Sequence, residues 1–368
     1  MKDINQDNIK KLAELIDRAE KIGIVAHIKP DGDALGSTSA LWYFLRKEGK
    51  ENVRLFLPHA YQHSQSFLLD SHLKSRLVIG EVNPQEAQNQ LLDCDLIVCC
   101  DFPEFSRAGE FEQALRNSDA KKIQIDHHLN PDRNAFDLSF SEIEVSSASE
   151  LEYFILVNLI HYKSYGKLIC DSEDYSKATS KLPSRALKAL MCGMTTDTNN
   201  FANSVRPGTL LMAAELLRAG VDREAILHRL YNRFSEKRTR LLGYMLKDLM
   251  TITPDGVAYI ILDKKTQQKY RVKEGDTEGF VNKPLEIAKV RMSILVKQDT
   301  ENENELRISI RSKAGTSANR CSGLYFNGGG HELAAGGRIH IGKEIACIAG
   351  MPEYIERNTH SFFNADNE

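Results

Sequence analysis

Histidine and aspartate residues recur in four short segments, each directly after a run of apolar residues. The segments are GIVAHIKPDGD, LIVCCD, KIQIDHH and MCGMTTD, and they contain His27, Asp31, Asp33, Asp101, Asp126, His127, His128 and Asp197. So many carboxylates in one place would be costly without cations. A mixture of imidazole and carboxylate suits Mn²⁺, with Fe²⁺, Co²⁺ or Mg²⁺ as alternatives. The segments therefore predict a divalent metal centre, if the fold brings them together.

The number of candidate ligands bears on the number of metal ions. Two His and four Asp are too many for one catalytic metal with an open position, so we expect two metals that share a carboxylate. Two ions about 3.5–4 Å apart are the usual arrangement for in-line displacement at phosphorus. A structural alternative stays open for each residue alone, because an Asp after a strand often caps a helix. Asp33, before ALGSTSALWYFL, fits that role.

In the first half of the chain, apolar runs that fit buried strands alternate with helical patterns. The strand candidates are GIVAH, VRLFL, LDCDLIVCC and KKIQI, and residues 6–21 and 34–48 have helical spacing of apolar residues. Such alternation predicts an α/β fold with a doubly wound, mostly parallel sheet. Ligands bind outside the carboxyl ends of the strands in such sheets, so we expect the His and Asp residues to meet at this edge.

The length of 368 residues predicts two domains. We expect a catalytic, metal-binding domain at 1–205, a helical connector at 206–253, a smaller α/β domain at 254–350 and a C-terminal tail at 351–368. The connector contains DREAILHRLYNRFSEKRTRLLGYMLKDLM, which is typical of one long, charged helix. VAYIILD, RMSILVKQ and ELRISIRS are strand candidates of the second domain, and DTENENE fits a hairpin loop between two of them.

Composition narrows the class of protein. Hydrophobic residues make up 42%, and 48 Lys and Arg against 51 Asp and Glu argue against a broad basic face for long double-stranded nucleic acid. Seven Cys without a C-x-x-C pair indicate reduced thiols and a cytoplasmic protein. No apolar stretch reaches the about 18 residues of a membrane-spanning helix, and the charged N-terminus differs from a signal peptide. A homodimer stays open.

The motifs match, in order, those of the DHH phosphoesterases, and the chain resembles this family over about residues 20–340. The matching segments are HIKPDGDALGS, Asp101 to Arg107 as D-x5-R, DHH at 126–128 and TTD ending at Asp197. RSK and GGGHELAAGG are similar to the DHH-associated second domain. Length and domain pair look most like the branch of nanoRNases and 3′-phosphoadenosine-5′-phosphate (pAp) phosphatases. The resemblance implies a DHH domain that faces a smaller α/β domain across a cleft.

The resemblance also implies the metal ligands. One metal would be held by His27, Asp31 and Asp101. The second would be held by Asp33, Asp101, His127 and Asp197, so that Asp101 is the bridge. Asp126 is then expected to orient an imidazole rather than to bind metal directly.

Two further residues near these motifs have expected roles. His128 would contact the scissile phosphate or help to protonate the leaving oxygen. Arg107 would steady the Asp101 loop as part of the catalytic set, and a surface ion pair is an equal alternative for it.

The second domain carries candidates for phosphate recognition. Gly328, Gly329 and Gly330 lack a Cβ, so their N–H groups can approach an anion closely. His331 follows them, and Arg311 with Ser312 ends a strand, from which a guanidinium can hold a phosphate bidentately. We expect these residues to bind the terminal phosphate of the substrate, which would favour short substrates.

We therefore expect a metal-dependent exoribonuclease and phosphatase. The substrates would be very short RNA, cut to 5′-mononucleotides by a water that both metals activate, and pAp as a second substrate. The nearest alternative is a phosphodiesterase for cyclic or linear dinucleotides such as cyclic di-AMP or pApA. Pyrophosphate is a poorer third choice. A non-catalytic nucleotide-binding protein is the alternative of another class, and metal-dependent turnover would separate the two.

Overall fold

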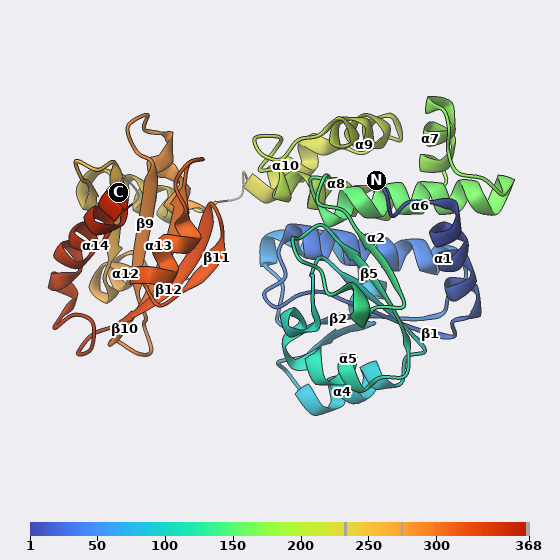
Figure 1. The fold of residues 1–368 in the computed structure, drawn as a ribbon, viewed down its shortest axis with the longest axis horizontal. Coiled ribbons are helices and arrows are strands. Elements are labelled where there is room, and N and C mark those ends of the chain that lie inside the picture. Colours follow the sequence, from blue (N-terminus) through green and yellow to red (C-terminus); the bar gives the residue numbers. More distant parts are fainter. Residues whose placement is uncertain (232–233, 274, 366–368) are drawn as a thin grey trace. The chain divides into compact units, whose positions relative to one another are not determined.

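The computed structural model of the protein describes residues 1–231, 234–273 and 275–365 (Figure 1). The chain divides into two compact units, Met1–Arg233 and Phe234–Glu368. Each unit contains a six-stranded sheet with a hydrophobic core of its own. The predicted α/β class is confirmed, and the two sheets differ in the direction of their strands.

The first unit is built on a parallel sheet, as predicted. Its strands lie in the order β3-β2-β1-β4-β5-β6, and all neighbouring pairs are parallel. They are β1 Lys21–Val25, β2 Asn52–Leu57, β3 Leu77–Ile79, β4 Leu96–Cys100, β5 Lys121–Asp126 and β6 Leu138–Ser141. Chain order reverses between β1 and β4, and sheets of this kind bind ligands at the carboxyl ends beside such a reversal.

Helices cover both faces of this sheet, with α2 and α6 on one face and α4 and α5 on the other (Figure 1). Trp42 and Phe44 of α2 are buried in the core, as expected for a helix packed between a sheet and other helices. The α-helices of the unit are α1 Gln6–Arg18, α2 Gly32–Lys47, α3 Ser71–Lys74, α4 Pro84–Leu92, α5 Glu112–Asn117, α6 Ala148–Tyr165, α7 Ser172–Thr179, α8 Ser184–Asp197, α9 Pro207–Arg218 and α10 Arg223–Tyr231. The 3₁₀ turns are η1 His63–Leu68, η2 Phe105–Phe111 and η3 Arg133–Ala135.

The second unit has a mixed sheet in the order β11-β12-β10-β9-β8-β7, in which only β8 and β9 pair in parallel. Its strands are β7 Met250–Ile252, β8 Val257–Leu262, β9 Met292–Gln298, β10 Glu305–Ser312, β11 Gly329–His331 and β12 Ala334–His340. Its helices and helical turns are α11 Glu236–Tyr244, η4 Met245–Leu249, α12 Lys264–Tyr270, η5 Phe280–Glu286, α13 Ala318–Tyr325, η6 Ile348–Gly350 and α14 Met351–Ala365. The three predicted strands are confirmed, and DTENENE joins β9 to β10 as a hairpin.

The boundaries of the units differ from the expected ones. The long helix predicted for the connector is wrong, because α10 ends at Tyr231 and α11 begins at Glu236. The Ser235 hydroxyl accepts the Arg238 N–H and so caps a new helix. The expected connector at 206–253 is therefore divided between the two units. Among the described residues, no helix is long and apolar enough to cross a membrane.

The segment expected to be a tail, 351–368, is helical over most of its described length. Helix α14 buries Met351, Ile355 and Phe362 in the core of the second unit. These apolar residues recur at helical spacing along one face, which the sequence analysis overlooked. The helix is thus part of the second unit's fold.

Candidate metal centre

Seven residues predicted for the metal centre gather at the carboxyl edge of the first sheet. They follow β1, β4 and β5, begin α2 and end α8, and they are His27, Asp31, Asp33, Asp101, His127, His128 and Asp197. Their side chains form three groups, and within each group the candidate ligand atoms lie within 4.8 Å of one another. The groups are His27, Asp31 and Asp101; Asp33, His127 and Asp197; and Asp101, His127 and His128. Two of the three groups share Asp101.

His27 presents its Nε2 atom to two carboxylates. Its Nδ1 atom lies 2.7 Å from the Ile28 carbonyl, which accepts the Nδ1 proton. Nε2 lies 3.4 Å from Asp101 Oδ2 and 3.8 Å from Asp31 Oδ1. A backbone carbonyl on one ring nitrogen is a common way to orient the other toward a metal. The imidazole is therefore oriented as a ligand would be.

Asp101 combines a strained backbone with an unsatisfied side chain. Its φ is 67°, in the left-handed region that residues other than glycine rarely adopt, and its N–H donates to the Ile125 carbonyl at 2.8 Å. The residue is 3% exposed, and in the described part of the chain its Oδ1 accepts no hydrogen bond. Strain together with an unsatisfied buried oxygen indicates a residue that holds a bound group.

The His127 imidazole lies among three carboxylates. Its Nε2 atom is 3.3 Å from Asp101 Oδ1, 3.5 Å from Asp197 Oδ2 and 3.9 Å from Asp33 Oδ2. All three distances are longer than a normal N–H···O hydrogen bond. A cation between these four side chains would satisfy all of them, whereas one imidazole proton cannot.

The buried Asp33 carboxylate is held by the start of α6. Its Oδ2 atom accepts the Ala148 N–H at 2.6 Å and its Oδ1 atom accepts the Ser149 N–H at 3.0 Å. The N-terminus of a helix stabilises a negative charge in this position. The cap of α2 is Asp31, not Asp33, because Asp31 accepts the N–H groups of Asp33 and Ala34. The capping alternative considered for Asp33 is therefore wrong.

The imidazoles of the centre bind protons strongly in the metal-free protein. Burial lowers the pKa of His27, but the adjacent Asp101 and Asp31 outweigh it and raise the pKa to about 11. For His127, burial is likewise outweighed by Asp101, which lies nearby with Asp197 and Asp33, and the pKa rises to about 10. Protons on these rings balance the carboxylates where no cation does so.

The three carboxylates around His127 differ in their proton affinity. Burial and the neighbouring Asp101 raise the pKa of Asp33 well above its usual value. Burial also raises the pKa of Asp197, to about 7. For Asp101, burial acts in the same direction, but the His127 and His27 imidazoles overcome it and hold the pKa well below its usual range. Among these three carboxylates, Asp101 is thus the one whose charged form is favoured.

Asp126 contacts an imidazole rather than the centre itself. Its Oδ1 atom lies 2.8 Å from His128 Nδ1, and the residue is fully buried at the end of β5. This contact agrees with the expectation that Asp126 orients an imidazole. His128 Nδ1 is also 3.8 Å from Asp101 Oδ1, so His128 borders the same group of atoms.

The backbone of Arg107, rather than its side chain, is tied to the edge of the sheet. Its carbonyl accepts the Ile28 N–H at 2.8 Å, which links η2 to the loop after β1. The side chain is exposed. This hydrogen bond connects the segment after β4 with the loop after β1, and the expected role of the Arg107 side chain in steadying the Asp101 loop stays a prediction.

In the second unit, the predicted phosphate-binding residues lie at the end of β10 and in the β11–β12 hairpin. Arg311 is half-buried, and its Nη1 atom donates to the Ile310 carbonyl at 2.9 Å. Burial lowers the pKa of this guanidinium, and none of the described carboxylates forms an ion pair with it. Ser312 is buried and donates its hydroxyl proton to the Thr316 carbonyl at 2.6 Å. Among the described residues, Arg311 is therefore a cation without a carboxylate partner.

The glycines of this hairpin have partners inside the second unit. The Gly330 N–H donates to Asn319 Oδ1 at 2.8 Å and the Gly328 N–H to the Ser322 carbonyl at 3.3 Å. A Cβ on Gly330 would meet the Ala334 carbonyl at 2.5 Å, so close backbone approach explains this glycine without a ligand. Two of the three amides expected to bind an anion are thus already used. The His331 side chain lies outside the described residues.

Sequence analysis did not identify the residues that support the centre from α6 and α8. Ala148 and Ser149 hold Asp33, and the run of small polar residues before this helix, SSAS, was the available signal for a helix start. Gly193 of α8 packs against them, because a Cβ there would meet Ser149 Oγ and lie 2.7 Å from Asp33 Oδ1. Glu152 is fully buried one turn further along α6, where burial and Asp33 raise its pKa well above the usual value.

Comparisons with known proteins agree with this geometry. The model of the DHH family, N-terminal domain, matches residues 21–194, which include every gathered residue except Asp197. The chain is 25% identical over 339 residues to the bifunctional oligoribonuclease and PAP phosphatase NrnA of Bacillus subtilis, covering 92% of this chain and 95% of that protein. It is 28% identical to a probable enzyme of the same name from Streptococcus mutans, over 89% of this chain and 92% of the relative.

A solved structure extends the similarity to the whole length. The exopolyphosphatase-related protein from Bacteroides fragilis is 31% identical, with a TM-score of 0.86 and full coverage of both chains. Motif order, the gathered side chains and these similarities agree with one another. The chain therefore belongs to the DHH family and is a phosphoesterase of that family.

Proposed function

We propose that the protein hydrolyses very short oligoribonucleotides to 5′-mononucleotides and also removes the 3′-phosphate of pAp. The two NrnA relatives, which match about nine tenths of the chain, carry both activities in their names. The observation that carries the proposal is the gathering of His and Asp side chains around Asp101 at one edge of the sheet.

These side chains would hold two divalent cations, which we propose to be Mn²⁺. The first would take His27, Asp31 and Asp101 as ligands. The second would take Asp33, Asp101, His127 and Asp197. When bound, such ions activate water and stabilise the negative charge that develops at phosphorus. The unsatisfied Oδ1 of Asp101 and the oriented Nε2 of His27 support this assignment.

The chain itself supplies proton transfer and orientation. Asp126 holds His128 through Nδ1, and we assign His128 to the scissile phosphate or the leaving oxygen. The Arg107 carbonyl, which accepts the Ile28 N–H, keeps the loop after β1 in place beside Asp31 and His27. Asp126 and Arg107 would therefore act through other residues.

We assign recognition of the substrate's terminal phosphate to the second unit, with Arg311 as its central residue. A half-buried guanidinium without a carboxylate partner among the described residues favours an anion. Ser312 and the hairpin of Gly328, Gly329 and Gly330 would hold this strand end in shape. The role of His331 rests on the motif alone. Such a site would favour substrates with few nucleotides.

The test is the release of product from pApA, pAp, cyclic di-AMP and pyrophosphate with Mn²⁺, beside a control with EDTA. We expect fast cleavage of pApA, slower release of phosphate from pAp, and none with EDTA. Preference for cyclic di-AMP would keep the metal assignment and overturn the proposed recognition of a terminal phosphate. If none of the four is turned over by protein that has bound metal, the protein is a nucleotide-binding protein rather than this enzyme.

A further inference from the structure

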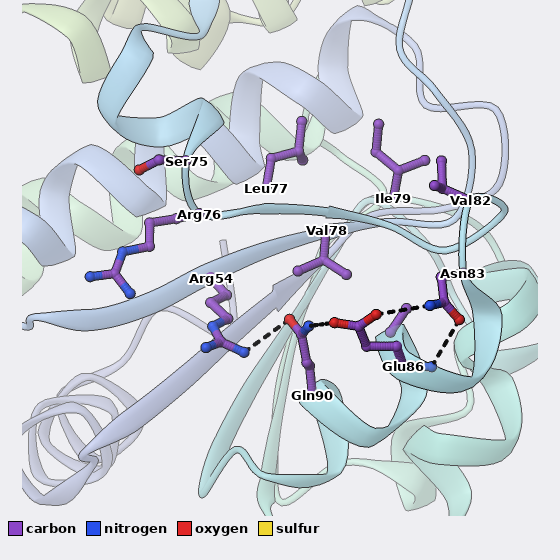
Figure 2. A pocket seen from close by; sticks show the side chains of 11 residues that line it. Arg54, Ser75, Arg76, Leu77, Val78, Ile79, Val82, Asn83, Glu86 and Gln90 are labelled. Carbon is purple, nitrogen blue, oxygen red and sulfur yellow. Dashed lines mark hydrogen bonds between the residues drawn. The ribbon is translucent and has the colours of Figure 1, made fainter.

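A groove lies beside the free edge of the first sheet, away from the metal centre. It has a volume of about 510 Å³, within the range of about 300–1,000 Å³ usual for small-molecule sites. Figure 2 shows Arg54 and Arg76 at one end, Val82 and Asn83 at the other, and Val78 between them. Helix α4 forms the opposite wall. Neither β2 nor β3, which border the groove, carries any of the seven gathered residues.

Arg54 lies on β2, and Arg76 lies in the turn directly before β3. Leu55 pairs with Leu77 in the register of β2 and β3, and the Leu55 N–H donates to the Arg76 carbonyl at 3.1 Å. Arg54 and Arg76 each precede that pair by one residue. Both side chains line the same end of the groove (Figure 2), so one anion bound there can contact both guanidiniums. Two like charges in this position are unfavourable without such an anion.

The carboxylate nearby does not neutralise both charges. Arg54 Nη1 donates to Gln90 Oε1 at 2.9 Å, and Gln90 donates to Glu86 at 3.2 Å. Glu86 also accepts from Asn83 Nδ2 at 2.8 Å, so this carboxylate is shared along α4. The Arg76 guanidinium has no hydrogen bond or ion pair within the described chain. Arg54 also interacts electrostatically with Asp93, which forms an ion pair with Lys21. Arg76 is therefore the guanidinium at this end of the groove that has no carboxylate partner within the described chain.

Apart from the polar side chains of Ser75, Asn83, Glu86 and Gln90, the rest of the groove is lined by apolar residues. Val78 of β3 and Ala87 of α4 are among these apolar residues, as is Val82, which is 78% exposed. A ligand that fits therefore has a doubly anionic group at one end and an apolar or planar body at the other. We propose that the groove is a second nucleotide site, which binds a nucleoside monophosphate with its phosphate on Arg54 and Arg76 and its base against Val78 and Val82. The nature of the ligand rests on the proposed function, because mononucleotides are the product of that reaction.

The experiment measures AMP binding to the full chain in EDTA, by calorimetry and by hydrogen–deuterium exchange. Inorganic phosphate and adenosine are titrated in parallel. We expect AMP to slow hydrogen exchange in β3 and α4. We also expect AMP to bind more tightly than inorganic phosphate or adenosine. Arg76→Gln removes a charge that makes no hydrogen bond or ion pair within the described residues, and we expect it to weaken AMP binding at least about tenfold, as for the loss of one charge-assisted bond.

Lys74→Gln is the matched control, because Lys74 is an exposed cation two residues away that does not line the groove. We expect this variant to bind AMP like the wild type, and both variants to keep their hydrolysis of pApA. Equal binding of AMP by Arg76→Gln, or equal affinities for phosphate and AMP, would overturn the proposal. Protection of β3 that depends on protein concentration and not on AMP would show a contact between two copies instead. Because the binding assay is run in EDTA, it does not depend on catalysis. If the protein did not hydrolyse pApA, the result of the AMP binding assay would still stand.

Discussion

At the scale of single residues, Asp101 determines how the candidate centre can work. It is buried, keeps its charge through two imidazoles and belongs to both the His27 group and the His128 group. The carboxylates around it are of a different kind, since burial favours the neutral form of Asp33 and Asp197. One permanently charged carboxylate between protonatable neighbours is an arrangement that a divalent cation would complete.

We expect Asp101→Asn to lower the rate of pApA hydrolysis more than about 100-fold. Mutation of residues that only hydrogen-bond to metal ligands already lowers activity about 10–100-fold. Asp126→Asn should fall within that smaller range and change the pH profile, since it affects only the orientation of His128. Steady-state kinetics with Mn²⁺ measures both variants. Asp119→Asn, on an exposed loop, is the control for charge. Near-normal activity of folded Asp101→Asn would remove this residue from the bridging position.

The buried Glu152 side chain should make the stability of the metal-free protein depend on pH. Its folded-state pKa lies well above the usual 4.5, because it is buried beside Asp33. The contribution of the neutral Glu152 to the free energy of unfolding is therefore fully present below about pH 4.5. It declines as the pH rises toward the pKa in the folded state, by up to about 1.4 kcal/mol per pH unit. Glu152→Gln carries no proton that titrates. We expect it to be more stable than wild type at pH 8 in EDTA and similar at pH 4.5, in denaturant titrations. A less stable variant at pH 8 would contradict this account.

At the scale of elements, the centre depends on how α2, α6 and α8 pack against one another. The start of α6 provides the amides that hold Asp33, while α8 contributes Asp197 at its end. Gly193 permits this packing because it has no Cβ. A Cβ at this position would meet the side chains of Ser149 and Asp33. The helices therefore fix the positions of Asp33 and Asp197, two candidate ligands that do not follow a strand.

We expect Gly193→Ala to destabilise the protein by about 1–3 kcal/mol, the usual cost of overpacking, and to weaken Mn²⁺ binding. Gly243→Ala is the matched control, because a Cβ at this helical position in α11 would meet nothing within 4 Å. That change should be neutral or stabilise by up to about 1 kcal/mol. Thermal unfolding and metal titration of both variants measure the effect. Equal unfolding temperatures for the two would contradict the proposed contact of α8 with Asp33.

At the scale of the whole molecule, the two units divide the chemistry between them. The first carries the gathered His and Asp residues, and the second carries a half-buried arginine that has no carboxylate partner in its described part. The candidate metal ligands and this arginine therefore belong to units with separate hydrophobic cores. Loss of metal should affect the first unit and leave the fold of the second intact.

Metal binding should release protons from the whole protein. His27 and His127, with pKa values of about 11 and 10, both carry a proton at pH 7 in the metal-free state and must lose it to become ligands. We expect more than two protons per chain on Mn²⁺ binding, because Asp33 and Asp197, whose pKa values are raised, also lose protons when they become ligands, and we expect an affinity that rises with pH. In EDTA, the pairs of protonated His27 and His127 with their neighbouring carboxylates stabilise the folded protein. This stabilisation is fully present below about pH 6.5 and declines as the pH rises through 10. Calorimetry in buffers of different ionisation enthalpy counts the protons. Binding without proton release would exclude these imidazoles as ligands.

The sequence by itself determined the α/β class, four strands of the parallel sheet and the residues of the centre. Apolar runs followed by His or Asp carry that information locally, since a strand and the residue after it are neighbours in the chain. It also determined the three strands after Val257, whose alternation is local as well. It did not determine the break between α10 and α11, because one serine cap outweighed a continuous helical pattern.

Only the tertiary structure decided which atoms face one another. That Asp33 rests on the start of α6 depends on residues more than 100 positions apart, and no local pattern reports such a pair. The same holds for Gly193, whose role is visible only against Ser149, and for Arg54 beside Arg76, which requires the register of two strands. Local spacing specifies which side chains are present at an edge. The pKa values and contact partners of these side chains follow from long-range packing, because packing determines how deeply each side chain is buried and which charges lie beside it.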